Sequence, residues 1–287
     1  MVKTVTEEQL VSLENTLFDI TFVFYLVAAL LYIVTYLIFK KEQKLGKYAT
    51  FIATMGLIVH TASIFVRMVN AARLTMHNQF EFATWFAWGI MFCYLFIERK
   101  FAYKYRGIGS FVVPIAFLMI LYASTLPSEI RPPMPALQSA WLSVHVITAI
   151  LGYGAFAVAC GISIMYLLKR RKAEDDNSIF NRSFFPSFEL LDNINYRAVA
   201  FGFMGLTLCI LTGAIWAEQA WGRYWGWDPK ETWSLITWIV YSIYLHARLT
   251  RGWKGTKTAW FSIIGFLCVL FTYVGVNMLL PSEHSYL

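Results

Sequence analysis

Charged residues are scarce in this sequence. Only 14% of its 287 residues are Asp, Glu, Lys or Arg, while 58% are hydrophobic. Soluble domains carry roughly 25% charged residues, so a chain of this length has too few charges to cover a water-facing surface. The composition therefore excludes a soluble enzyme, a disordered scaffold and a nucleic-acid reader, and it indicates a protein that crosses a membrane several times.

Cysteine pairs are missing as well. None of the four cysteines has a partner at Cys-x-x-Cys spacing, and each stands inside an apolar run: Cys93, Cys160, Cys209 and Cys268. A thiol-redox centre and a zinc site both need cysteines grouped at short spacing, so the sequence indicates neither. We interpret the four cysteines as small apolar side chains inside a helical bundle.

Long apolar runs dominate what is present. A helix needs about 20 apolar residues to cross a bilayer, and eight segments offer such a run, the third short and the fifth long: 17–39, 48–69, 82–97, 108–126, 140–168, 198–217, 233–250 and 258–280. The sequence therefore predicts an all-α polytopic membrane protein with about eight transmembrane helices in one integral membrane domain, 1–287. The first segment follows no basic region and no small-residue cleavage site, so we expect it to be retained.

The basic residues are unevenly shared among the loops. Most of the 24 lysines and arginines lie in four alternate loops, around residues 40–47, 99–106, 169–197 and 248–257. Loops rich in Lys and Arg stay in the cytoplasm, so we expect these four inside and both chain termini outside. The net charge of +7 is then a topology signal, not a nucleic-acid site. The second half of 169–197 is expected to lie in the membrane interface as a short amphipathic helix.

Tryptophan is concentrated around one outer loop. Six of the chain's 11 tryptophans fall between residues 216 and 238: Trp216, Trp221, Trp225, Trp227, Trp233 and Trp238. Tryptophan favours the membrane interface, but an aromatic belt accounts for two or three of these residues, not for six interleaved with Gly222 and Gly226. The loop 216–233, named the Trp loop below, therefore indicates a concave aromatic surface suited to a large, flat, apolar ligand.

A helix-start signature follows within this loop. Asp228 can cap the next helix, Pro229 suits its first position, and Glu231 can reach back to complete a capping box. The start of a helix carries a partial positive charge, and Arg223 and Lys230 lie nearby in the sequence. Such a surface can meet carboxylates, so a tetrapyrrole with two propionates fits the loop.

Four of the five histidines fall into two groups by their expected depth. His145 and His284 are expected at the outer side, flanking the Trp loop, whereas His60 and His246 lie inside apolar segments. Ionisable groups within a membrane indicate function by default, although a single one is often a satisfied core residue. Two imidazoles from facing helices give haem iron a six-coordinate site. The fifth histidine, His77, stands in a polar outer loop, where we expect it to be exposed.

The combined pattern resembles a known family. The run WGRYWGWDPKETW resembles the tryptophan-rich WWD signature of haem-handling membrane proteins, and the match is close for the CcsA branch of system II cytochrome c biogenesis. Other stretches resemble further parts of that family, so the resemblance covers nearly the whole chain: HTASIFVRMVNAARLTMHNQFEFATWFAW, PALQSAWLSVHVITAILGYGAFA, YLHAR and EHSYL.

The resemblance implies roles for particular residues. By position, His145 and His284 are similar to the family's outer axial ligands of haem iron, and His60 and His246 are similar to its membrane pair. The residues implied to contact haem in the loop are Trp221, Trp225, Trp227, Asp228 and Trp233. No residue of the chain is implied to act as a nucleophile, which agrees with the missing cysteine pair.

The resemblance also implies a ligand, partners and a location. Haem b is both substrate and ligand. The implied partners are a ResB/CcsB-type membrane protein with a large extracytoplasmic domain, apocytochrome c and thiol-reducing thioredoxin-like proteins, with no nucleic acid. The membrane is the bacterial cytoplasmic membrane or the thylakoid, with the Trp loop and both termini extracytoplasmic. The chain is then a component of a cytochrome c haem lyase that works with its ResB-type partner.

The function implied is haem delivery across the membrane followed by covalent attachment to apocytochrome c. We expect haem to pass from His60 and His246 to His145 and His284, where its vinyl groups meet the reduced thiols of a CxxCH motif. The protein contributes positioning, and the reactive groups belong to haem and substrate. Three alternatives stay open: a haem exporter without ligation, a b-type haem electron-transfer subunit, and a structural scaffold, which leaves the Trp loop unexplained.

Overall fold

The structure, a computed structural model, describes residues 6–38, 44–174 and 178–280, and within these ranges it contains helices and no strands. The α-helices are α1 (Glu7–Ile33), α2 (Lys44–Ala71), α3 (Gln79–Lys100), α4 (Gly109–Ser124), α5 (Ala140–Arg171), α6 (Phe188–Trp221), α7 (Pro229–Arg251), α8 (Thr256–Leu270) and α9 (Val276–Leu279). The connections contain three 3₁₀ turns, η2 (Arg106–Ile108), η3 (Pro135–Leu137) and η4 (Ile179–Asn181). Two π-helical turns extend α1 and join α8 to α9: η1 (Val34–Ile38) and η5 (Phe271–Gly275).

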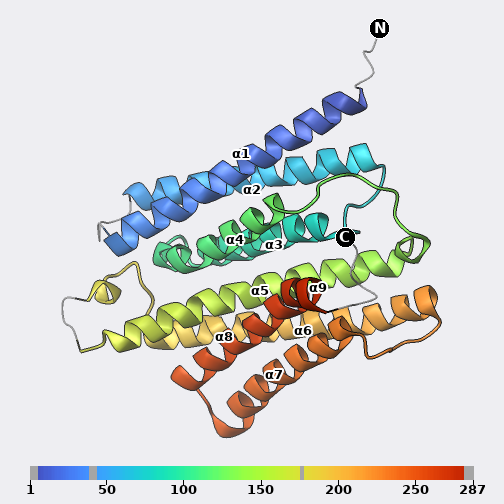
Figure 1. Ribbon diagram of the computed structural model, residues 1–287. Coiled ribbons are helices and arrows are strands. Elements are labelled where there is room, and N and C mark those ends of the chain that lie inside the picture. The colour runs from blue at the N-terminus through green and yellow to red at the C-terminus, as the bar shows by residue number, and fades with distance from the viewer. Residues whose placement is uncertain (1–5, 39–43, 175–177, 281–287) are drawn as a thin grey trace.

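The expected fold class is confirmed. Seven of the described helices are long and apolar enough to cross a membrane, and α7 packs beside α6 and α8 as a less apolar eighth (Figure 1). The chain is therefore an integral membrane protein, and the prediction of about eight spans is close. The third predicted segment, 82–97, is short, but α3 is longer than this apolar run because it continues through polar residues at both ends to 22 residues. Helix α5 is long, as expected, with 32 residues.

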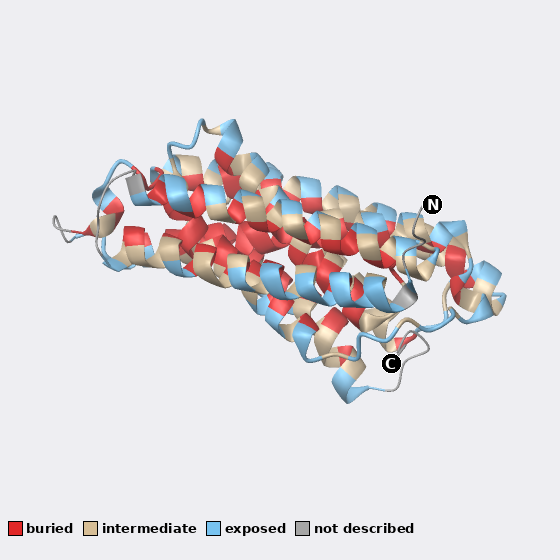
Figure 2. Ribbon diagram, turned by 90° about the horizontal axis from the view of Figure 1, so that it is seen from above, coloured by how far each residue is buried: buried red, intermediate tan, exposed pale blue. Residues whose placement is uncertain are grey.

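Helix α5 lies at the centre of the bundle. In its most apolar stretch, 78% of the residues are buried inside the bundle. The helix packs against α3, α4, α6 and α8. Glycine lets α5 and α6 approach closely, because a Cβ on Gly205 would lie only 2.9 Å from the Cα of Gly152, and small residues permit such contacts in membranes. Figure 2 shows the buried residues running along the inside of the bundle. Helices α1 and α2 pack against each other at one side of α5, and α7 lies at the opposite side.

A buried ion network joins the first three helices at one end of the bundle. A guanidinium nitrogen of Arg67 on α2 lies 2.6 Å from a carboxylate oxygen of Glu14 on α1, and a second lies 3.2 Å from Glu81 on α3. Arg73 lies 3.1 Å from the other oxygen of Glu81. The charges of two acidic and two basic side chains therefore compensate one another at a buried place where a lone charge would be costly.

The connection between α5 and α6 differs from expectation. Helix α6 begins at Phe188, so the second half of 169–197 is mostly the first turns of a spanning helix. Phe184 and Phe185 are buried and pack against Tyr36 of η1. The expected short interface helix is therefore wrong, because the residues from Phe188 onward belong to α6 and the two aromatic side chains before it are buried at the end of the bundle.

Candidate functional site

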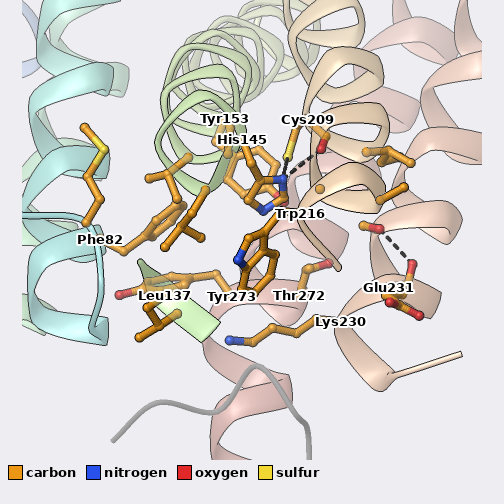
Figure 3. A pocket seen from close by; sticks show the side chains of 18 of the residues that line it. Phe82, Leu137, His145, Tyr153, Cys209, Trp216, Lys230, Glu231, Thr272 and Tyr273 are labelled. Carbon is orange, nitrogen blue, oxygen red and sulfur yellow. Dashed lines mark hydrogen bonds between the residues drawn. The ribbon is translucent and has the colours of Figure 1, made fainter. Parts of the chain in front are cut away.

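A cavity opens at the end of the bundle where α3, α5 and α7 begin and where α6 and α9 end (Figure 3). Its volume is about 180 Å³. Aromatic and aliphatic side chains form most of the wall, among them Phe82, Leu137, Tyr153, Trp216, Trp225 and Tyr273. A few polar side chains converge on it: His77, Gln79, His145, Lys230, Glu231 and Asn277. An apolar cavity with few polar groups is typical of a small-molecule site.

His145 reaches this cavity from the second turn of α5. Its Nδ1 lies 2.8 Å from the backbone carbonyl oxygen of Cys209 and 3.5 Å from the Cys209 sulfur. A carbonyl oxygen can only accept a hydrogen bond, so Nδ1 carries the hydrogen and Nε2 carries the lone pair. The contact with α6 therefore sets the tautomer that a metal ligand requires.

The position of this imidazole also depends on α6. A Cβ on Gly213 would lie 2.6 Å from Nδ1 of His145 and 2.8 Å from its Cε1. The ring of Trp216 stacks on the imidazole, with centroids 6.1 Å apart and planes inclined by 26°. Helix α6 thus supplies the carbonyl, the space and one aromatic wall for a side chain that belongs to α5.

The Trp loop is fastened to the start of α7. The Asp228 side chain accepts a hydrogen bond from the backbone N–H of Lys230 at 2.9 Å. The Glu231 carboxylate accepts from the backbone N–H groups of Gly226 and Asp228, at 2.8 and 3.1 Å. At its other side, α6 ends on Gly222 with φ at +70°, a conformation that glycine adopts without strain. The predicted capping box is therefore confirmed.

The tryptophans of the loop have different surroundings. Trp216 and Trp225 line the cavity, and Trp221 packs edge-on against Trp216 with centroids 4.8 Å apart. Trp227 is 68% exposed, and Trp233 packs on η5. Among the five residues predicted to contact haem, Trp225 is the one that lines the cavity as described. Trp216 lines it too, although the family resemblance does not imply it as a contact.

The other predicted iron ligands are separated. His284 lies outside the described residues, so its place opposite His145 stays a prediction. His60 is fully buried on α2, with Nδ1 3.0 Å from the hydroxyl of Tyr25, whereas His246 is exposed on α7. Because α2 and α7 lie on opposite sides of the bundle (Figure 1), these two histidines do not face each other within one chain.

His77 lines the cavity, contrary to its expected exposure. Its side chain is 12% exposed, its Nδ1 lies 2.8 Å from a nitrogen of Arg73, and its backbone N–H donates to Glu81 at 2.8 Å. Burial, helped by the nearby Arg73 charge, lowers the pKa of His77 below its usual value. The expectation is wrong because the ion network draws this polar loop onto the bundle, where the side chain of His77 is largely buried.

These features define the class of the protein. It is a polytopic helical membrane protein with an aromatic cavity at one end, into which an imidazole of fixed tautomer projects. The chain belongs to the cytochrome C assembly protein family, whose model matches residues 76–284. All residues that line the cavity, from Met76 to Asn277, fall within the match, while α1 and α2 precede it.

Individual relatives agree with this membership. The chain is 34% identical to "Cytochrome c biogenesis protein CcsA" of Guillardia theta over 93% of this chain and 94% of the relative. It is 36% identical to the protein of that name in Prochlorococcus marinus over 82% of each chain. It is 40% identical to the one in Chlamydomonas reinhardtii over 78% of this chain and 64% of the relative. The expected family is confirmed.

Proposed function

We propose that this chain holds haem in the cavity beside the Trp loop and attaches it covalently to apocytochrome c, as one component of a cytochrome c synthase. The observation that supports this most is His145. Its Nδ1 donates to the Cys209 carbonyl, and in a neutral imidazole this places the lone pair on Nε2, which is the arrangement of oriented metal-ligating histidines. His284 is the second axial ligand in this proposal.

The cavity suits haem by chemistry, and its size implies motion. Aromatic side chains match the porphyrin ring, and Lys230 gives the wall a cation for a carboxylate. The volume of about 180 Å³ is below the roughly 300–1,000 Å³ of common ligand pockets. Haem entry therefore requires the Trp loop to move away from α5. The hydrogen bonds between the Trp loop and the first turn of α7 let the loop move together with the start of that helix.

The part of this chain in the reaction is positioning. Each thioether forms when a thiol of a CxxCH motif adds across a haem vinyl group, with sulfur bonding to one vinyl carbon and the thiol hydrogen going to the other. Nothing leaves and no oxidant is consumed, so the chain needs no nucleophile of its own. Holding two reacting groups in the right geometry can supply roughly 7–11 kcal/mol of the barrier.

In this proposal, haem passes through two separate binding sites on its way across the membrane, one at His246 and one at His60. His246 lies in a shallow hollow with Arg251 and Trp253 on the outside of α7, so haem bound there takes its second ligand from another chain. His60 is sealed against Tyr25, so haem reaches it when α1 and α2 separate. The pair is therefore proposed as two sites and not as the two ligands of one haem.

The proposed setting follows from the basic loops. They face the cytoplasm, and the cavity and Trp loop face the extracytoplasmic side of the bacterial cytoplasmic membrane or the thylakoid. A ResB/CcsB-type protein is the membrane partner and apocytochrome c the substrate. Thioredoxin-like proteins keep the CxxCH thiols reduced, because a disulfide has no thiol hydrogen to add to a vinyl group.

The test combines the purified chain, its ResB-type partner, haem and reduced apocytochrome c. We expect a bis-imidazole optical spectrum and covalent haem on the cytochrome. His145→Ala should abolish the covalent product while the protein stays in the membrane, and added imidazole should restore part of it by filling the axial position. Asn70→Leu, a change on α2 outside the cavity, should retain the product.

Two outcomes contradict the proposal. Normal cytochrome maturation by His145→Ala removes His145 as a ligand. Haem that crosses the membrane without any thioether forming, with the partner present, means that the chain exports haem and does not take part in ligation.

A further inference from the structure

Three polar side chains of the cavity have buried atoms with unused hydrogen-bonding capacity. Among the residues that the structure describes, the indole nitrogen of Trp225, the amide nitrogen of Gln79 and both amide atoms of Asn277 make no hydrogen bond, although each of these atoms is buried. All three side chains line the His145 cavity. A buried donor without a partner is unfavourable, so this wall favours a ligand that supplies acceptors.

The three donors come from different elements that meet at the cavity. Gln79 is the first residue of α3, Trp225 belongs to the Trp loop, and Asn277 belongs to α9. The hydroxyl of Tyr273 donates to the backbone carbonyl of Gln79 at 2.6 Å, which fastens the start of α3 to η5. This π-helical turn leads directly into α9, and π-helical turns often occur at functional sites.

The chemistry of the wall specifies the ligand group. An indole N–H can only donate, and each amide nitrogen has two hydrogens to donate. The ammonium group of Lys230 extends into the same cavity (Figure 3). A carboxylate, with about four acceptor positions, satisfies several N–H donors and one cation together. The rest of the wall is apolar, so the carboxylate belongs to a largely apolar molecule.

We propose that Gln79, Trp225 and Asn277 bind the propionate carboxylates of haem and thereby fix which edge of the ring enters the cavity. This inference rests on the proposed function and deepens it. In haem the two propionates lie together on one side of the ring, away from the vinyl groups. Holding the propionates at α3 and α9 leaves the vinyl edge pointing away from these residues, where the thiols of apocytochrome c approach.

The experiment compares haem with haem dimethyl ester, which keeps the ring and iron but has no carboxylates. Both are titrated into the full-length protein in lipid nanodiscs, and the outer-site signal is the part of the optical change that His145→Ala removes. Gln79→Leu and Asn277→Leu should each weaken haem binding roughly tenfold, because hydrogen bonds to charged groups are the strong ones. The affinity for the ester should fall much less, because its neutral carbonyl oxygens accept weaker hydrogen bonds than a carboxylate does.

Two further variants separate recognition from folding. Asn277→Asp keeps the shape of the side chain and adds a negative charge, so it should weaken binding of haem more than binding of the ester. Asn70→Leu is the matched control, because the Asn70 amide nitrogen also makes no hydrogen bond among the described residues but does not line the cavity. It should change neither affinity.

The outcomes are distinct. Equal losses for haem and ester, or unchanged haem affinity in all cavity variants, overturn the assignment of the propionates and leave the proposed haem site standing. A complete lack of outer-site signal in the unmodified protein overturns the proposed function itself, and this inference with it.

Discussion

A single backbone carbonyl decides what His145 can do. The carbonyl oxygen of Cys209 accepts from Nδ1, and this leaves Nε2 as the nitrogen with a lone pair. The imidazole comes this close to α6 because Gly213 has no side chain at the point of contact. A glycine four residues along α6 from Cys209 is therefore a positioning residue for a histidine on another helix.

Gly213→Ala should displace the imidazole of His145. The added methyl carbon would lie 2.6 Å from Nδ1, so the ring must move and its bond to the Cys209 carbonyl must lengthen. We expect the bis-imidazole spectrum of the outer haem to weaken and added imidazole to restore it, as for His145→Ala. The measurement is the optical spectrum of the purified complex with and without imidazole.

A second glycine supplies the control for overpacking. A Cβ on Gly265 of α8 would lie 2.5 Å from the ring of Tyr241, and neither residue lines the cavity. Gly265→Ala should lower thermal stability and leave the haem spectrum unchanged. If both glycine variants behave alike, Gly213 has only a packing role.

At the scale of elements, the start of α7 organises the Trp loop. Asp228 and Glu231 together bind backbone N–H groups of the loop and of the first helical turn. The two tryptophans that line the cavity lie in different parts of the Trp loop, Trp216 in the last turns of α6 and Trp225 in the stretch between α6 and α7. The geometry of the aromatic wall therefore depends on a helix cap more than on any one ring.

Asp228→Ala should damage cytochrome maturation more than Trp221→Phe. Loss of a helix cap costs about 1 kcal/mol and releases the loop that carries Trp225. Replacing Trp221 by Phe keeps an aromatic ring against Trp216. We expect Asp228→Ala to lose outer-site haem and covalent product, measured as haem stoichiometry and covalent cytochrome yield. Full yield from the Asp228 variant would show that the loop is not the ligation platform.

At the scale of the whole molecule, buried charges tie the helices of the first half together beside the cavity. Glu81 accepts from Arg67, Arg73 and the backbone of His77, so one carboxylate holds α2, α3 and the loop between them. That loop carries His77 into the cavity wall. The ion network is therefore a structural support for one side of the site.

Glu81→Gln should destabilise the protein strongly. It leaves the positive charges of Arg67 and Arg73 buried with one carboxylate fewer, and breaking a buried ion pair typically costs about 3–5 kcal/mol. The matched control is Glu129→Gln, because Glu129 pairs with Arg131 at 2.8 Å while both side chains are largely exposed, a pair worth about 0–1 kcal/mol. Thermal unfolding in one detergent compares the two variants, and equal shifts would contradict the structural role of the network.

The helices and the local motif follow from the amino-acid sequence alone. A chain in a bilayer must satisfy its backbone hydrogen bonds within each spanning segment, so long apolar runs predict the existence of α1 to α8. The helix starts are less predictable, since α1 and α6 each begin ten residues before the predicted segments 17–39 and 198–217. The capping box of Asp228 and Glu231 was predictable, because its hydrogen bonds join residues within one helical turn. The resemblance carried by the Trp loop led to the correct family for the same reason, since the motif is contiguous.

Which side chains share the cavity depends instead on how the helices pack against one another. Membrane helices are apolar on most sides, so periodicity does not show which face points inward. The burial of His77, the tautomer of His145 and the separation of His60 from His246 each depend on how one helix is rotated against another. Gln79 and Asn277 stand far apart in the sequence and meet through α3, η5 and α9. Their N–H donors form one site because helix packing brings them together, and this contact cannot be predicted from their spacing in the sequence.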